Sequence, residues 1–362
     1  MKKIDSYILK KFLFTFFFCI LLMTLIVVVI DISEKTDDFV KSKLSAGQVF
    51  MQYYIWFIPR IDAMLFPLFV FIGVIFFTSK MAERTEVVAI LSSGVSFRRF
   101  LLPYWMGSIF LAGILWLGYQ LVLPRANTNW NNFETKYIPS AINLINGSAR
   151  RNFYFRLDSS AYACIRSYDT TNKAGYNFFI QRVEKNQLVY NLRADNITWD
   201  TAQRKWKLTN VMERFFKGDN ETVKHSQSLS LLYNFKPKDL RRDEFLKDGF
   251  TTPELNEMIQ LEKLRGGEGL SSLLVERYNR DAIPVSVIIL TMIGAILSSR
   301  KVRGGSGFHL AIGVVLSVLY ILFSRFSLIF STKGNFPPLL AAWVPNAAFA
   351  LLAYYLYRRA AR

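Results

Sequence analysis

The sequence predicts an α-helical membrane protein with six transmembrane helices, three before and three after an inserted all-β domain. The first observation is composition: 52% of the 362 residues are hydrophobic and 32 are phenylalanine, which is too apolar for a soluble chain of this length. The second is six largely uncharged runs, each near the roughly 20 residues that a helix needs to cross a bilayer. The third is a central stretch where aromatic and β-branched residues recur in short blocks.

The six apolar runs form two groups of three. They occupy residues 12–30, 54–79, 100–123, 282–299, 308–330 and 339–357. Pro59, Arg60 and Asp62 interrupt the second run near its start. The first run lacks a small-residue cleavage site and is followed at once by Asp31 and Glu34, so we interpret it as a permanent span and not as a signal peptide.

Basic residues near the ends of the spans predict the orientation. They gather on one side of a six-span chain, at Lys2, Lys3, Lys10, Lys11, Lys80, Arg84, Arg98, Arg99, Arg300, Lys301, Arg303, Arg358, Arg359 and Arg362. Because positive residues are retained in the cytoplasm, we expect both termini there and the long central segment outside. Long translocated domains are largely exempt from this rule.

Residues 125–250 predict an antiparallel sandwich or roll. From Arg150 onward, strand-forming blocks alternate with turn residues every eight to twelve positions. The blocks are residues 152–157, 162–168, 177–183, 188–192, 196–199, 205–209 and 229–235. Residues 200–203, which lie between Trp199 and Trp206, predict a hairpin turn.

A helical connection is predicted after the β-domain. Thr252 and Pro253 are typical of an N-cap and a first helical residue. A second helix then enters the fourth span through Glu276, Arg277 and Arg280. We therefore divide the chain into spans one to three at 1–124, the β-domain at 125–250, connecting helices at 251–280 and spans four to six at 281–362.

The loop after the second span predicts a short amphipathic helix at about 81–95. Acidic and basic residues begin it, apolar residues share one face and a glycine can end it. Such a helix could be a linker on the membrane surface, but its acidic first turn is unusual for a lipid-bound helix. Glu86 is the candidate residue for contact with a basic groove on a partner protein. The candidate contact residues are Glu83, Arg84, Glu86, Val87, Ile90 and Gly94.

Several segments together resemble the lipopolysaccharide export permease family, LptF and LptG. They are the start at residues 4–12, the helix at 83–94, Pro124 after the third span, residues 277–284 entering the fourth span and residues 343–346 in the sixth. The resemblance implies a multi-pass protein in the inner membrane of a Gram-negative bacterium, with a periplasmic β-jellyroll. It also implies pairing with a paralogous permease, a cytoplasmic ATPase dimer that seats on the helix at 81–95, and a periplasmic bridge protein that receives the lipid.

Substrate contacts are expected from cations near the outer interface, because lipid A phosphates pair with Lys and Arg through charge-assisted bonds. The candidates are Lys35, Lys41, Lys43, Arg60 and Arg325. The lysines could instead be solvated or snorkelling charges. Arg325 lies among apolar residues, where a charge is costly; its alternatives are snorkelling and pairing with Asp31 or Asp62. The resemblance places spans one and five at the lateral opening for the lipid.

Enzymatic and nucleic-acid functions are disfavoured. Two histidines and two cysteines in unrelated segments predict no metal site or catalytic centre, and the basic residues are too scattered for a nucleic-acid interface. No Gly-x-x-x-x-Gly-Lys-Ser/Thr motif occurs, so ATP and Mg²⁺ are expected on a partner ATPase, with no cofactor on this chain. A membrane scaffold or sensor with a ligand-binding β-domain is the alternative class. The sequence does not distinguish the two paralogues.

Overall fold

The computed structural model describes residues 3–138, 153–158, 160–169, 172–185, 187–201, 203–218, 220–233, 235, 237, 246–265, 269–300 and 305–360. The chain divides into two compact units. The helical unit comprises Met1–Phe133, Asp248–Leu255 and Ser271–Arg362, and the β-unit comprises Glu134–Lys247 and Asn256–Leu270. Each unit is described by itself below.

Six stretches of helix in the described residues are long and apolar enough to cross a membrane, which confirms the predicted spans. The helices are α1 (Lys3–Lys41), α2 (Ala46–Val49), η1 (Phe50–Tyr54), α3 (Ile55–Glu83), α4 (Glu86–Ser92), α5 (Phe97–Leu117), η2 (Gly118–Val122), α6 (Leu123–Tyr137), α8 (Leu246–Gly249), α9 (Thr252–Arg265), α10 (Leu270–Ser298), α11 (Gly305–Lys333) and α12 (Pro338–Ala360). At 1.5 Å per residue, the 39 residues of α1 extend about 58 Å, well beyond a hydrocarbon core of about 30 Å. One helix can therefore carry contacts at both membrane surfaces.

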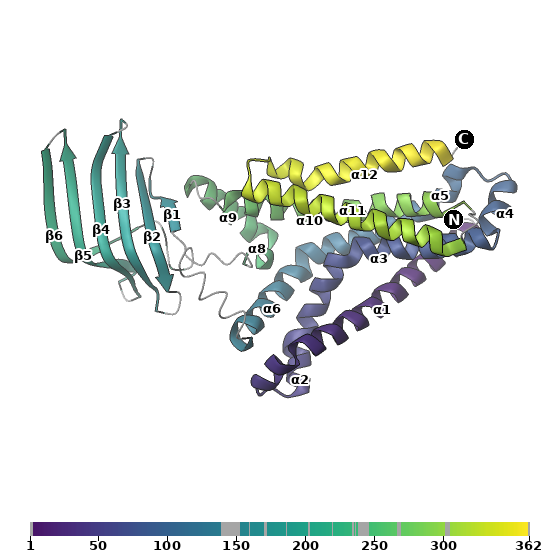
Figure 1. Ribbon diagram of the computed structural model, residues 1–362, viewed down its shortest axis with the longest axis horizontal. Helices are drawn as coiled ribbons and strands as arrows, with labels where there is room; N and C mark the ends of the chain where they lie inside the picture. Colours follow the sequence, from purple (N-terminus) through teal and green to yellow (C-terminus); the bar gives the residue numbers. More distant parts are fainter. Residues whose placement is uncertain are drawn as a thin grey trace. The chain divides into compact units, whose positions relative to one another are not determined.

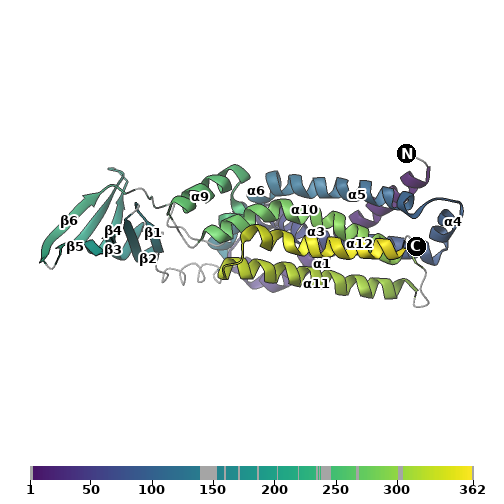
Figure 2. The ribbon, with the colours of Figure 1, turned by 90° about the horizontal axis from the view of Figure 1, so that it is seen from above.

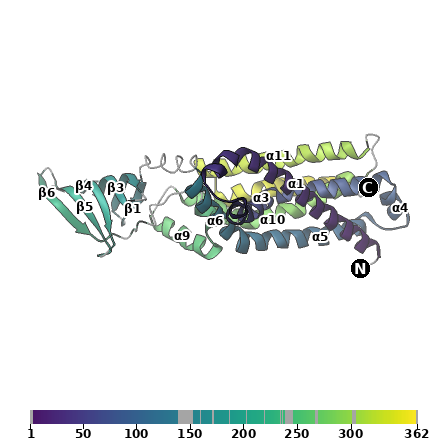
Figure 3. The same cartoon turned by 90° about the horizontal axis from the view of Figure 1, so that it is seen from below.

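Helix α3 is the centre of the helical unit. One face joins α1 and α5 in an apolar core that includes Phe12, Val74 and Tyr104. A second face joins α10, α11 and α12 around Phe71 and Ile293. Both termini and α4 lie at the same end of this unit (Figures 1 and 2), and α1 lies on its outside (Figure 3).

The β-unit contains one antiparallel sheet with its strands in sequence order (Figure 1). The strands are β1 (Phe153–Arg156), β2 (Ala161–Asp169), β3 (Ala174–Glu184), β4 (Gln187–Asp200), β5 (Lys205–Lys217) and β6 (Asn220–Leu231). The predicted hairpin joins β4 to β5. Trp199 pairs with Trp206 there, and the backbone amide of Gln203 donates to the Asp200 carboxylate at 3.1 Å. The inserted all-β domain is thus confirmed.

A transverse crease crosses this sheet. One residue in each strand from β2 to β6 is left out of the pairing, and these residues form one level across the sheet. The register is the same on both sides of this level. The skipped level consists of Arg166, Asn177, Asp195, Asn210 and Gln227. Asn177 and Asn210 have φ of 53° and 52°, a left-handed conformation that asparagine adopts more readily than most residues. The Asn210 amide also donates to Asp195 at 2.9 Å.

The crease keeps both halves of the sheet facing one core. Side chains of the apolar core follow at every second residue within each half, as in Ala163 and Ile165 of β2. Across the crease the spacing is three residues, from Ile165 to Tyr168 in β2 and from Ala194 to Ile197 in β4. All of these residues belong to a single apolar cluster.

Helix α9 begins one residue earlier than an N-cap at Thr252 would require. Thr252 is the first helical residue and Thr251 precedes it, so Pro253 occupies the second helical position. The side chain and amide of Thr251 both donate to Glu254 at 2.8 Å, and these hydrogen bonds lower the pKa of the Glu254 carboxyl. Thr251 is therefore the N-cap residue, because the residue three positions after it is Glu254, which accepts both hydrogen bonds. The following helix, α10, is continuous through Pro284.

Candidate functional site

Helix α4 is held against the helical unit by three apolar residues, Val87 with the partly buried Ile90 and Leu91, and by one carboxylate. Val87 is 1% exposed and belongs to the core formed by α1, α3 and α5. The Tyr7 hydroxyl of α1 donates to the Glu86 carboxylate at 3.0 Å, and Lys11 donates to the same hydroxyl. Glu86 therefore links α4 to the first turns of α1.

The residues just before and just after α4 are exposed. Glu83 and Arg84 precede it and are exposed, and Ile90 is half-buried. A left-handed Thr85 (φ 60°) starts the helix, and Gly94 (φ 87°) follows it. Gly94 suits that conformation because it carries no Cβ. These turns fix the direction of a short helix whose other side is free to contact a second protein.

A second cluster surrounds Asp31, near the other end of α1. Asp31 is 8% exposed and accepts hydrogen bonds from the hydroxyls of Tyr53 at 3.1 Å and Tyr54 at 3.0 Å. Lys35, one turn further along α1, lies 3.4 Å from the same carboxylate. Its ammonium also donates to the Tyr53 hydroxyl at 2.5 Å. The carboxylate is thereby satisfied by groups from α1 and η1.

Two of the predicted lipid-contacting cations meet at Trp130 of α6. The Arg60 guanidinium lies 3.6 Å from the ring centroid, and the Lys35 ammonium lies 5.6 Å from it. Both distances are within the range of cation–π attraction. We name the set Asp31, Lys35, Tyr53, Tyr54, Arg60 and Trp130 the Asp31 cluster.

The remaining predicted cations lie apart from the Asp31 cluster. Lys41 is the last residue of α1 and Lys43 follows it with φ of 57°; both are exposed. Arg325 is exposed on α11. Among the described residues it forms no ion pair with Asp31 or Asp62, because Asp31 has the partners above and Asp62 accepts from Thr24 at 2.6 Å.

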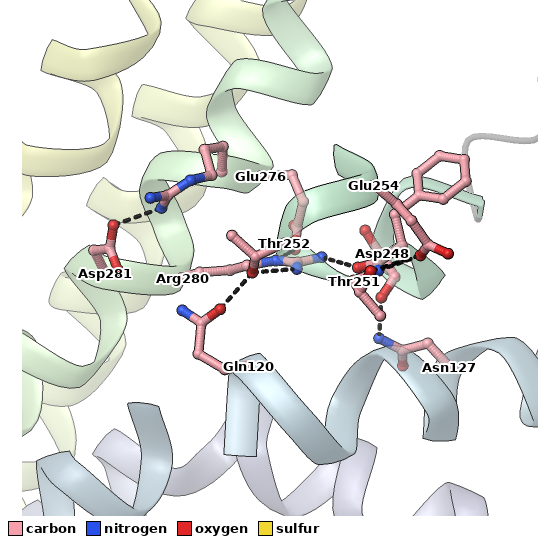
Figure 4. A network of polar contacts seen from close by, with 11 residues as sticks. Gln120, Asn127, Asp248, Thr251, Thr252, Glu254, Glu276, Arg280 and Asp281 are labelled. Carbon is pink, nitrogen blue, oxygen red and sulfur yellow. Dashed lines mark hydrogen bonds and ion pairs between the residues drawn. The ribbon is translucent and has the colours of Figure 1, made fainter. Parts of the chain in front are cut away.

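A buried arginine joins α10 to the segment before α9 (Figure 4). Arg280 is 1% exposed, and its guanidinium donates to Glu276 at 3.0 Å, the Thr252 hydroxyl at 3.1 Å and the Phe250 carbonyl at 2.8 Å. Thr252 in turn donates to Gln120 of η2. This network fixes the chain where it returns from the β-unit.

A neighbouring contact secures the same segment to α6. The side-chain amide of Asn127 donates to the Asp248 carbonyl at 2.9 Å, and the Thr128 hydroxyl donates to the Gly249 carbonyl at 3.2 Å.

The sequence identified Arg280 only as a residue on the way into the fourth span. The four-residue spacing from Glu276 to Arg280 was the available signal, since it favours a pair on one helical face.

The fold and these sites define a multi-pass membrane protein with an inserted β-domain, a short helix exposed at one end of its helical unit and clustered cations at the other end of α1. The sequence model of the family described as Lipopolysaccharide export system permease LptF/LptG matches residues 6–359, and the chain belongs to this family. It is therefore a permease of lipopolysaccharide export, a transport subunit that is not itself catalytic and that works with partner subunits. Comparison with individually curated proteins found no match.

Proposed function

We propose that this chain is one of two paired permeases in an ATP-driven exporter that extracts lipopolysaccharide from the inner membrane and passes it to a periplasmic bridge. In this proposal both termini and α4 face the cytoplasm, and the β-unit lies in the periplasm. Family membership supports the cargo. The single observation that carries the proposal is α4, a helix fixed by Val87 and Glu86 with exposed residues on either side.

Energy for transport is supplied by a separate cytoplasmic ATPase dimer, which binds ATP and Mg²⁺. The absence of a phosphate-binding Gly-x-x-x-x-Gly-Lys-Ser/Thr motif from the sequence supports this division. The ATPase would contact Glu83, Arg84 and Gly94 on the exposed side of α4. The Glu86 carboxylate would then either leave the Tyr7 hydroxyl for a basic group of the ATPase or contact both groups at once.

A paralogous permease is proposed as the partner within the membrane. Helices α1 and α11 present wide apolar surfaces, and the side chain of Phe14 is 74% exposed. Acyl chains and a second permease are both suitable neighbours for such surfaces. Two permeases that meet along these helices would enclose a path for a lipid with several acyl chains.

The lipid phosphates are proposed to bind the cations at the far end of α1. Lys41, Lys43 and Arg325 are exposed, and Lys35 and Arg60 converge at Trp130. Arginine suits phosphate because its guanidinium makes paired hydrogen bonds. The strands β1 and β6 have one neighbour each among the described residues, so either is a candidate edge for strand addition by the bridge protein.

Charge reversal of Glu86 tests the proposal. We expect Glu86→Lys to reduce co-purification of the ATPase by at least about tenfold, since a like charge would face a basic groove. Glu184→Lys, an exposed reversal on β3, is the matched control and should retain the ATPase. Tyr7→Phe removes the hydroxyl, and with it the hydrogen bonds to Glu86 and from Lys11, and so separates these internal contacts from docking.

Retention of the ATPase by Glu86→Lys would contradict the docking role of α4. A membrane scaffold or sensor is the competing function, and it would remain active in cells without any ATPase. ATP hydrolysis by the purified chain alone would contradict the division of labour. Both measurements can be made on the same co-expressed preparation.

A further inference from the structure

We infer that Asp31 is an internal counter-ion for Lys35 that competes with the phosphate groups of the transported lipid. The inference rests on the proposed function, because it explains how the same cations would discriminate among anionic lipids. Lys35 and Arg60 carry two positive charges into one aromatic environment, and Asp31 supplies one negative charge there. A strong anion that contacts Lys35 therefore has to compete with the Asp31 carboxylate.

One oxygen of the Asp31 carboxylate is held independently of Lys35. The Tyr54 hydroxyl donates to this oxygen, whereas the Tyr53 hydroxyl, which accepts from Lys35, donates to the oxygen that the lysine contacts. The carboxylate therefore stays in place when the lysine leaves. A counter-ion that is held in this way can receive its cation back after the ligand has gone.

The contact between Lys35 and Asp31 is suited to exchange. Its 3.4 Å separation is longer than the roughly 2.7–2.9 Å of a strong charge-assisted hydrogen bond. The short contact of the ammonium is with the neutral Tyr53 hydroxyl, at 2.5 Å. A phosphate oxygen that approaches the ammonium at full hydrogen-bond distance would replace the longer contact without moving the tyrosine.

Arg60 provides the second half of the receiving site. Its guanidinium lies over Trp130 at 3.6 Å, which orients the planar group through the ring face. Lys35 approaches the same ring at 5.6 Å. A ligand with closely spaced phosphates gains contacts with both cations, whereas a phospholipid with one phosphodiester gains fewer. Asp31 would therefore raise the affinity threshold and favour multiply phosphorylated lipids.

Lipid displacement tests the role of Asp31. The intact complex in nanodiscs would be loaded with a fluorescent bisphosphorylated glycolipid and titrated with unlabelled bisphosphorylated glycolipid, dephosphorylated glycolipid, phosphatidylglycerol or inorganic pyrophosphate. We expect Asp31→Asn to bind the bisphosphorylated lipid about fivefold more tightly, a change of about 1 kcal/mol. The same variant should gain more for phosphatidylglycerol, so that discrimination falls. The double variant Asp31→Asn/Lys35→Ala should lose the gain.

Asp62→Asn is the matched control. Asp62 also connects α3 to α1, but it accepts from the neutral Thr24 hydroxyl at 2.6 Å. We expect its replacement to leave lipid affinity unchanged. Should Asp31→Asn fail to assemble, Asp31→Glu extends the carboxylate toward Lys35 and should weaken binding. Tighter binding by Asp31→Glu would contradict the inference.

The outcomes separate this inference from the proposed function. If wild-type affinity falls in Lys35→Ala but does not rise in Asp31→Asn, the counter-ion role is wrong and the lipid site stands. If phosphorylated and dephosphorylated lipids bind alike, both the lipid assignment and the counter-ion role fail. Displacement by pyrophosphate as strong as by the glycolipid would assign the site to a free anion and would refute the discrimination among lipids.

Discussion

Replacement of Arg280 should open the junction between α10 and the segment before α9. The guanidinium is buried and donates hydrogen bonds to Glu276, to Thr252 and to the Phe250 carbonyl. Arg280→Ala removes all three and leaves the Glu276 carboxylate without this cation. The Phe250 carbonyl and the Thr252 hydroxyl would then have to find water at a site where the arginine had excluded it.

The magnitude follows from burial. Removal of one partner from a buried ion pair costs about 3–5 kcal/mol. The Glu276 side chain is 18% exposed, so water can reach its carboxylate. We therefore expect Arg280→Ala to cost about 3 kcal/mol of unfolding free energy, the lower end of this range. Arg280→Lys keeps the charge, but one ammonium cannot match three acceptors arranged around a planar fork, so we expect an intermediate loss.

Arg277 provides the matched control on the same helix. It pairs with Asp281 at 2.6 Å with the same four-residue spacing, but both side chains are partly exposed. Such a pair is worth about 0.3–0.5 kcal/mol. Thermal unfolding of the full chain in detergent and the rate of proteolysis near residues 246–251 would compare Arg280→Ala with Arg277→Ala. Equal stability and equal cleavage in the two variants would refute the reasoning.

Two further predictions concern local backbone structure. Asn210→Val should destabilise the β-unit of the full chain by about 1–2 kcal/mol, because a β-branched residue is strained at φ of 52°. Asn210→Gly should be close to wild type, and equal losses in thermal unfolding would contradict the crease. The lowered pKa of Glu254 means that its capping contribution is present at neutral pH and is lost as the pH falls through the folded-state value. Helical content near α9 should therefore lose its acid dependence in Glu254→Gln; an unchanged acid transition would contradict this.

The spans could be predicted because their signal is local. A run of about 20 apolar residues in a helix has few alternatives to crossing a bilayer. The sequence did not show how far each helix continues on either side, since polar residues such as those at 31–41 are compatible with both a helix and a loop. The continuous α1 depends on contacts such as Tyr53 with Asp31, which join distant segments.

The predicted strand blocks differ from the strands in β5 and β6 and at one level of the sheet. The blocks at 205–209 and 229–235 omit residues 210–217 of β5 and 220–228 of β6, and the second block continues past Leu231. The failure at the one level of the sheet has a physical cause. The block at 177–183 begins at the crease, and the blocks at 188–192 and 196–199 divide β4 around it. Asparagine and aspartate are typical of turns, so Asn177 and Asp195 favoured strand ends. In the structure the strands continue through these residues, because pairing on both sides holds a single left-handed position between them.

The candidate cations were identified by type, but their arrangement required the fold. Lys35 and Arg60 meet at Trp130, which lies 95 and 70 residues away in the chain and carries no sequence signal for this role. In the sequence, Asp31 marks the end of the first apolar run and is a candidate partner of Arg325. Its tyrosine partners explain its presence, because a buried carboxylate requires hydrogen bonds from its surroundings.

Helix α1 connects the two sites on which the proposals depend. Tyr7 contacts Glu86 of α4, and Asp31 lies 24 residues later in the same helix, about 36 Å along its axis. A docked ATPase that moves α4 would therefore act on the end of a helix whose other end holds the cations for the lipid. Helices transmit axial and rotational displacement over such distances when no break intervenes, and none occurs between Lys3 and Lys41. Under the two proposals, Tyr7→Phe should leave lipid binding intact but reduce its dependence on ATP. A response to ATP that is unchanged in this variant would place the coupling on another helix.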